Sequence, residues 1–417
     1  MKDNNEFDDH PFEFEDDIYD ISDSLKKQVN DELNKDMQES DYDKMNETTK
    51  RTNRKNKKRK KRKVLRVIGI IFLCLILFST WLIGTKSGRN LIYKIASNYV
   101  VNTVNKGNED KNNETETPEE VYVDFATWER DYPYREEEYV KNYLIFGVEE
   151  IGGGKNTDAM IIASINTNDK TIKLTSLLRD TYILREGYSA TKLNSLYAKG
   201  GIELLISTIE QKYMIKIDGY ANVNFESFED IIDALGGIDI ELGEAEANYL
   251  RTTNYISKKE NRNVVAGWNH LNGNQVMGYV RVRKVSTLGG ANNDYGRTVR
   301  QRRVLNAIFE QYKSQSIFKL IPIMNTCLGY VNTNLSAKQI ESMMEAVIEN
   351  KITTIEDFRL PVDGLFESPS SYGGVSYPIV VDWDANIIEI YKFLFNDTQE
   401  EAVANLQALK GTSTVGQ

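Results

Sequence analysis

The residues best suited to chemistry in this sequence are arginines that recur in short segments. They are Arg179 in SLLRDTY, Arg281 and Arg283 in YVRVRK, and Arg297, Arg300, Arg302 and Arg303 in NDYGRTVRQRR. If YVRVR is extended, its two arginines share one face, and on a helix Arg297, Arg300 and Gln301 share another. A guanidinium stays charged at any working pH and can donate to two phosphate oxygens at once. The set could therefore hold a pyrophosphate, although any one arginine could instead be solvated or paired with an acidic side chain.

Carboxylates stand at the ends of predicted strands, where α/β folds usually place their sites. Glu149 and Glu150 follow YLIFGV, and Asp158 precedes AMIIASI. Hard oxygen ligands of this kind suit Mg²⁺, which binds one or two protein carboxylates together with phosphate oxygens. Asp180 and Asp294 are further candidates, but Asp294 could instead cap the following helix and Glu150 could lie on the surface. The glycines after Glu150 do not form a GxxxxGK[ST] motif, so a nucleotide P-loop is not indicated.

The composition excludes several classes of protein. The chain has 52 basic and 62 acidic side chains, a net charge of −10, which argues against a protein that binds nucleic acid over its whole surface. With only Cys74 and Cys327, no disulfide framework or cysteine zinc site is expected. Because His10 lies in an acidic segment, a histidine-based triad has one candidate, His270. The chemistry must therefore depend on carboxylates, arginines, hydroxyls or the backbone.

A long apolar segment near the N-terminus predicts a transmembrane helix. Residues 67–85, VIGIIFLCLILFSTWLIGT, are 19 uncharged residues. As a helix they would rise about 28 Å, which matches a hydrocarbon core of about 30 Å. The preceding RTNRKNKKRKKRKVLR has 11 basic and no acidic residues, and beside a span we interpret it as a topology signal rather than a nuclear or nucleic-acid signal. We therefore predict a single-pass protein of the cell membrane, with a cytoplasmic N-terminus and an extracytoplasmic C-terminal domain.

Changes in composition divide the rest of the chain. Residues 1–66 are highly charged with scattered apolar positions, which predicts a disordered tail ending in the basic run. Residues 86–120 should form a juxtamembrane helix and then a polar linker. A folded extracytoplasmic domain is expected at 121–310. Residues 311–417 either complete that domain or form a small accessory extension.

Within the folded region, strand patterns alternate with helical ones. Residues 142–150 are typical of a buried strand, and residues 159–178 of two strands joined by a turn at 166–170. GGIELLISTIEQKYM has apolar residues at helical spacing, which predicts core packing or the wall of a lipid-tail pocket. The alternation predicts an α/β domain, an α-β-α sandwich with a mixed central sheet and helices on both faces.

From about Asn142 to Leu305 the chain resembles the LytR-CpsA-Psr family. The matching motifs, in order, are LIFGVE, NTDAMIIASI, SLLRDTY, KLNSLYAKGG, FESFEDIIDALGGIDI, LNGNQVMGYVRVR and NDYGRTVRQRRVL. Each motif alone is short, but seven in order across about 160 residues are specific. The tail, single span and outer domain also resemble the topology of that family.

The resemblance implies a glycopolymer phosphotransferase with a divalent cation, Mg²⁺ or Mn²⁺. The residues expected to hold the pyrophosphate are Arg179, Arg281, Arg283, Arg297 and Arg300. Asp158 matches the metal-site aspartate of the family's Arg-Ser-Asp-Thr motif, and Glu149 stands where a second aspartate is usual. Asn156 replaces the arginine of that motif. Lys155 could supply a point charge there, but an ammonium cannot reproduce a bidentate contact.

The expected reaction moves a glycopolymer phosphate, of a teichoic acid or a capsular or wall polysaccharide, from a polyprenyl-pyrophosphate carrier to a peptidoglycan hydroxyl at the membrane, without nucleic acid. Asp180 is our candidate for the base that accepts the proton of the attacking hydroxyl. Gln301 should lie beside the pyrophosphate, and Leu205 and Ile209 on the aliphatic helix should face the isoprenoid. Two alternatives stay open from the sequence: a non-catalytic adaptor or regulator that binds the carrier lipid, and a pyrophosphatase that transfers the phosphate to water.

Overall fold

The computed structural model describes residues 84–98, 128–151, 154–313 and 330–413, together with a few residues between 315 and 327. Residues 86–98 are helical, in the segment predicted as a juxtamembrane helix. The predicted tail, the linker and all but the last two residues of the predicted span lie outside the described residues. Among the helices that are described, none is both long and apolar enough to cross a membrane.

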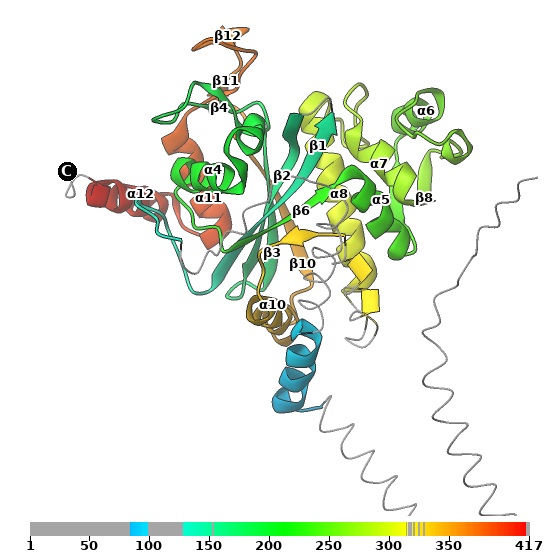
Figure 1. Ribbon diagram of the computed structural model, residues 1–417, viewed down its shortest axis with the longest axis horizontal. Coiled ribbons are helices and arrows are strands. Elements are labelled where there is room, and N and C mark those ends of the chain that lie inside the picture. The colour runs from blue at the N-terminus through cyan, green and yellow to red at the C-terminus, as the bar shows by residue number, and fades with distance from the viewer. Residues whose placement is uncertain are drawn as a thin grey trace, which may run out of the picture. The chain divides into compact units, whose positions relative to one another are not determined.

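A six-stranded mixed sheet forms the centre of the domain (Figure 1). Its strands are β1 (Val140–Ile151), β2 (Gly154–Asn166), β3 (Thr171–Leu177), β6 (Gly219–Asn224), β9 (Asn332–Thr333) and β10 (Thr354–Leu360). Their order is β10-β3-β2-β1-β6-β9. The first three strands are an antiparallel meander, β6 runs parallel to β1, and β10 runs parallel to β3. The prediction of an α/β fold with a mixed central sheet is confirmed.

The hairpin between β2 and β3 forms where the sequence predicts a turn. The side-chain oxygen of Asn166 accepts hydrogen bonds from the backbone N–H groups of Asn168 and Asp169, at 3.0 and 3.2 Å. Lys170 then takes a positive φ of 59°. An asparagine that bonds to the backbone two and three residues ahead stabilises such a turn and fixes the register of the two strands.

One face of the sheet is covered by α4 (Leu196–Tyr213) and α11 (Trp383–Phe395). Alternate residues of β1 and β2, such as Leu144 and Ile162, pack against these helices and are fully buried. Leu205 and Ile209 of α4 belong to the same core, with 0% of their surface exposed. The aliphatic helix α4 therefore packs in the core and does not form the wall of a lipid-tail pocket.

The opposite face carries α5 (Phe225–Ala234), α8 (Asn293–Tyr312) and α10 (Ala337–Glu349), and α7 (Gly273–Arg281) packs against α5 and α8 (Figure 1). A second core joins α6 (Glu244–Thr252) and the antiparallel pair of β7 (Ile238–Leu242) and β8 (Gly267–Leu271) to this group. The remaining elements are α12 (Gln399–Ser413), β4 (Tyr182–Ile183), β5 (Thr191–Lys192), β11 (Phe366–Glu367), β12 (Ser371–Tyr372), β13 (Val375–Ser376), β14 (Val380–Val381) and two 3₁₀ turns, Leu193–Ser195 and Lys259–Asn261.

The YVRVRK segment, whose two arginines would share a face if it were extended, is helical at its start. Asn272 begins α7 with a capping box to Gln275, and the helix continues to Arg281 before Val282 becomes extended. Val276 and Tyr279, three residues apart, are fully buried in the second core. Burial of this helical face and the cap outweigh the strand preference of the alternating valines. The helix therefore ends between the two arginines.

The described residues after 330 complete the same sheet and core. β10 pairs with β3 along seven residue pairs, from Thr354 opposite Thr171 to Leu360 opposite Leu177. Ile390 and Leu394 of α11 are fully buried with the helix α4. The C-terminal segment thus supplies both edge strands of the sheet, β9 and β10, and half of one helical layer.

Candidate active site

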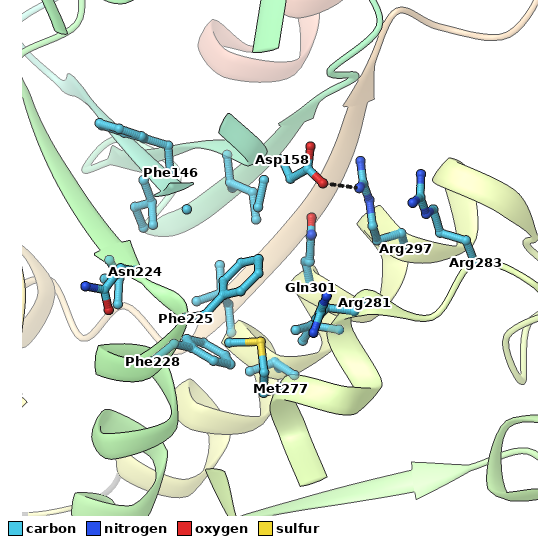
Figure 2. Close-up of a pocket in the computed structure, with 18 of the residues that line it drawn as sticks. Phe146, Asp158, Asn224, Phe225, Phe228, Met277, Arg281, Arg283, Arg297 and Gln301 are labelled. Carbon is cyan, nitrogen blue, oxygen red and sulfur yellow. Dashed lines mark hydrogen bonds and ion pairs between the residues drawn. The ribbon is translucent and has the colours of Figure 1, made fainter. Parts of the chain in front are cut away.

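A cavity of about 230 Å³ lies between the sheet and the helices α5, α7 and α8 (Figure 2). Most of its wall is apolar: Phe225 and Phe228 from α5, Met277 and Val280 from α7, Val304 and Leu305 from α8, and Ile145, Ile161 and Val223 from the strands. The polar residues at the wall are Asp158, Asn224, Arg281, Arg283, Arg297 and Gln301. The cavity therefore combines an aliphatic and aromatic chamber with a cationic end.

The predicted lipid wall is not the wall of this cavity. Leu205 and Ile209 lie in the core on the α4 face of the sheet, whereas the cavity lies on the face of α5 and α8. Phe225 and Phe228, which do line it, were not singled out from the sequence. Their spacing of three places both on one side of a helix, and this was the available signal.

Asp158 of β2 is held by two arginines that come from different elements. Nη1 of Arg179, which follows β3, donates to both of its carboxylate oxygens at 2.7 and 2.8 Å. Nη1 of Arg297, on the first turns of α8, donates to Oδ2 at 3.2 Å (Figure 2). The Asp158 carboxylate therefore joins three elements: the start of β2, the turn after β3 and the start of α8.

Asp294 forms the second acidic centre of this network. Its carboxylate lies 3.4 Å from Nε of Arg179, 3.5 Å from Nη2 of Arg297 and 3.5 Å from Nη1 of Arg283. Burial alone would raise the pKa of this carboxyl, but the positive charges of Arg297, Arg179 and Arg283 outweigh burial and hold the pKa below its usual value. Asp294 is therefore ionised throughout the neutral range.

The network leaves donor capacity for a further anion. Within the described part of the chain, the buried Nε atoms of Arg179 and Arg297 have no hydrogen-bond acceptor. Two arginines of the network line the cavity. The side chain of Arg297 is only 5% exposed, whereas that of Arg283 is 40% exposed. Buried donors without acceptors are uncommon in native proteins. Nε of Arg297, which lines the cavity, is the one that an oxyanion there would satisfy, because Nε of Arg179 faces the carboxylates of Asp294 and Asp180 at 3.4 and 3.6 Å.

Arg281 and Gln301 also line the cavity, as the sequence predicted for the pyrophosphate region (Figure 2). The guanidinium carbon of Arg281 lies 5.1 Å from the centre of the Phe225 ring, within cation–π range. Arg281 ends α7, where the last carbonyls favour a positive charge. This residue thus stands at the boundary between the apolar wall and the cationic end.

Arg300 does not join the cavity, and this corrects the sequence-based assignment. It is fully buried, and its Nε donates to Glu246 at 2.7 Å while its two Nη atoms donate to the carbonyls of Val282 and Val285. Three residues along a helix leave a rotation of about 60° between side chains. That rotation turns Arg300 toward α6, so it stabilises the chain after α7 instead of facing a ligand.

Two other predicted residues, Asp180 and Lys155, are not among the residues that line the cavity. The Asp180 carboxylate forms ion pairs with Nζ of Lys192 at 2.9 Å and with Nε of Arg179 at 3.6 Å. Lys155 pairs in the β1–β2 ladder opposite Glu150 and does not line the cavity. Lys192 was not identified from the sequence, because its contact with Asp180 depends on the pairing of β4 with β5.

The predicted metal ligands form only part of a metal site here. Asp158 is a suitable hard ligand, but both of its oxygens contact guanidiniums. The backbone of Glu149 pairs with Asn156, and the Glu149 side chain is outside the described part. Among the described residues no three His, Cys, Asp or Glu side chains are grouped to hold a metal. A cation at Asp158 would therefore need further oxygens, from Glu149 or from a bound phosphate.

The LytR_cpsA_psr family model matches residues 97–385, and the chain belongs to this family. It is 31% identical over 225 residues to the polyisoprenyl-teichoic acid–peptidoglycan teichoic acid transferase TagU of Bacillus mycoides (strain KBAB4), covering 53% of this chain and 68% of that protein. It is 30% identical over 225 residues to the transferase TagV of Bacillus subtilis (strain 168), covering 51% and 55%. The crystal structure of B. subtilis TagT is 25% identical, covers 64% of this chain and 94% of that chain, and gives a TM-score of 0.47.

The buried pair of Arg300 and Glu246 generates a stability prediction. Arg300→Ala removes the nearest cation of the buried Glu246 carboxylate, which keeps only Nη1 of Arg303 at 3.8 Å and the backbone N–H of Gly243 at 2.9 Å. The free energy of unfolding should therefore fall by about 3 kcal/mol, the lower end of the range for a broken buried pair. Denaturant unfolding of the full-length protein measures this change. The double variant Arg300→Met, Glu246→Leu removes both charges and should recover most of the loss. Wild-type stability of Arg300→Ala would contradict the structural role.

The lowered pKa of Asp294 gives a pH prediction. A carboxyl whose pKa is lower in the folded state stabilises the fold above its unfolded pKa of about 3.9, and this contribution is lost as the pH falls through the folded value. Asp294→Asn should therefore be less stable than wild type at pH 6, and the difference should shrink below about pH 4. Unfolding curves between pH 3 and 7 test this. A difference that is constant with pH would exclude the charge network as its cause.

Proposed function

We propose that the protein is a membrane-anchored transferase that moves a glycopolymer phosphate from a polyprenyl-pyrophosphate carrier to a hydroxyl of peptidoglycan. The observation that carries the proposal is the cavity itself, in which an apolar chamber continues into a group of arginines. A prenyl pyrophosphate has the same division between a hydrocarbon tail and a multiply charged head. The names of the relatives, teichoic acid transferases, point to the same substrate class.

The reaction suits a site built from guanidiniums. The oxygen of the acceptor hydroxyl bonds to the phosphorus that carries the sugar, the bridging P–O bond breaks, and prenyl phosphate leaves. Such transfers depend mainly on positioning and on stabilising charge at the phosphate oxygens. Arg281, Arg283 and Arg297 line the cavity for this purpose, and Arg179 stands behind Asp158. Asp180 is our candidate acceptor for the hydroxyl proton, with Lys192 and Arg179 holding its carboxylate.

A divalent cation, Mg²⁺ or Mn²⁺, is part of this proposal, with Asp158 and Glu149 as its protein ligands. When bound, it would neutralise charge on the phosphate oxygens. Asp158 stands at the cavity wall next to the arginines that would receive the same phosphate. A ligand that carries its own oxygens would complete the coordination that Asp158 begins.

The proposed location follows from the N-terminal sequence. Residues 67–85 would span the cell membrane once, leaving residues 1–66 in the cytoplasm and the domain with the cavity outside. A carrier lipid is confined to the same membrane. Tethering the site there raises its effective concentration relative to the carrier.

The arginines of the cavity give a direct test of the mechanism. Arg297→Ala and Arg283→Ala should each lower kcat for transfer from a synthetic prenyl-pyrophosphate sugar by about 10²–10³-fold, because each removes charge stabilisation from the phosphate. Arg251→Ala, on the exposed face of α6, is the matched control and should transfer at the wild-type rate. Wild-type rates in both cavity variants would overturn the proposal.

Analysis of the products separates the alternatives. With a wall-glycan acceptor, a transferase should form the polymer–glycan phosphodiester, whereas a pyrophosphatase would release the sugar phosphate at the same rate with or without acceptor. Lipid binding with neither product would indicate the adaptor. Asn156, which takes the place of an arginine in the family motif, is the feature of this chain that favours the adaptor.

The proposed cation site is tested by measuring Mn²⁺ affinity. Glu149→Ala should weaken Mn²⁺ binding in the presence of a prenyl pyrophosphate by about tenfold or more, since Glu149 would supply one ligand. Paramagnetic Mn²⁺ titration of wild type and variant measures this without turnover. Equal affinity in the two proteins would remove Glu149 from the metal site.

A further inference from the structure

A hairpin near the C-terminus, residues 366–381, is highly exposed and carries one charged side chain, Glu367 at its base. Residues 368–381, SPSSYGGVSYPIVV, contain no Asp, Glu, Lys or Arg, in a chain in which 27% of residues are charged. Tyr372 is 49% exposed and Tyr377 is 74% exposed. Two large aromatic rings are therefore exposed on an uncharged segment that also contains serines and glycines.

The hairpin is an ordered ribbon rather than a loose loop. Its base is the β11–β14 pair, with Phe366 opposite Val381, and its outer part is the β12–β13 pair. The backbone N–H of Tyr377 donates to Ser370 at 2.8 Å. Gly373 and Gly374 form the tip with positive φ values of 54° and 80°, which glycine adopts without strain. The exposed rings are thus held on a defined backbone.

The hairpin is attached to the turn that follows Arg179. Ile379 donates to the carbonyl of Asp180 at 2.9 Å and accepts from the backbone of Tyr182 at 2.8 Å. The ring of Tyr182 meets that of Tyr372 edge to face, with centroids 4.9 Å apart. Since Tyr182 is three residues after Arg179, its backbone lies within about 11 Å of that arginine. The aromatic surface and the arginine network therefore share one short segment of chain.

We propose that this hairpin binds an uncharged glycan strand, the acceptor of the reaction, with Tyr372 and Tyr377 as its contact residues; this rests on the proposed function. Exposed tyrosines offer rigid amphipathic faces at low entropic cost, and serine and glycine add adaptable hydrogen bonding. An anionic glycopolymer would instead be recognised by lysine or arginine, which the hairpin lacks. The chemistry of the hairpin thus fits the neutral sugar backbone of the acceptor and not the charged polymer of the donor.

The position of the hairpin would place a bound glycan close to the proposed reaction site. A glycan strand on Tyr372 is held beside Tyr182 and so beside the turn that carries Arg179 and Asp180. Binding a polymer next to the reacting group raises the effective concentration of its hydroxyls there. The cavity selects the donor by its tail and pyrophosphate, and the hairpin selects the acceptor.

Binding of an uncharged β-1,4-linked N-acetylglucosamine oligosaccharide to the full-length protein in detergent tests the proposal without turnover. Wild type should bind, and Tyr372→Ala and Tyr377→Ala should each raise the Kd by about tenfold, while Tyr372→Phe, which keeps the ring, should bind like wild type. Trp268→Ala removes another exposed aromatic ring, 69% exposed on β8, and should leave Kd unchanged. Circular dichroism confirms that each variant is folded.

The outcomes distinguish the hairpin from the transferase. Glycan binding that the tyrosine substitutions abolish, without any transfer product, supports the hairpin and overturns the proposed function. Transfer by wild type with unchanged glycan Kd in both alanine variants overturns the hairpin and leaves the function standing. In the transfer assay, Tyr377→Ala should raise the KM for the glycan acceptor about tenfold with a smaller change in the KM for the donor. Self-association through the hairpin, abolished by Tyr377→Ala, would overturn a glycan as its occupant.

Discussion

The ion pairs that Asp158 and Asp294 form with Arg179, Arg283 and Arg297 are the interaction on which the rest of the site depends. Charges removed from water are tolerated only when they are paired and hydrogen-bonded. The guanidiniums can therefore be concentrated at one end of a cavity only because two carboxylates lie among them. The same constraint requires β2, the turn after β3 and the start of α8 to stay in register, since each supplies a member of the network.

One face of the central sheet forms the hydrophobic core and the other lines the cavity. The face under α4 and α11 is packed with fully buried aliphatic side chains and supplies stability. The face under α5 and α8 encloses the cavity. Because neighbouring residues of a strand point to opposite faces, β1 places Leu144 in the core and Ile145 in the cavity wall. A site can thus be shaped on one side of the sheet without weakening the core on the other side.

The C-terminal segment contributes both to the core and to the turn that carries Arg179 and Asp180. β10 and α11 extend the sheet and the core, and the ribbon between them returns to the turn that carries Asp180. The position of Arg179 therefore depends on residues that lie about 200 positions later in the chain. Through this connection the exposed hairpin bonds to the turn after Arg179 without lining the cavity.

The sequence by itself determined the residue types of the site, the mixed α/β fold and the hairpin turn at 166–170, because these follow from local pattern and from ordered motifs. It also indicated that Arg281, Arg283, Arg297 and Gln301 act at one place, and they do line one cavity. Only the tertiary structure decided which arginine faces the cavity and which faces a buried glutamate. Arg297 and Arg300 are three residues apart on one helix and so about 60° apart around its axis. The packing of α6 and α7 against that helix decides that the first direction meets the cavity and the second meets Glu246. Likewise, the aliphatic pattern of α4 could not show which face of the sheet it covers, because both faces require apolar helices.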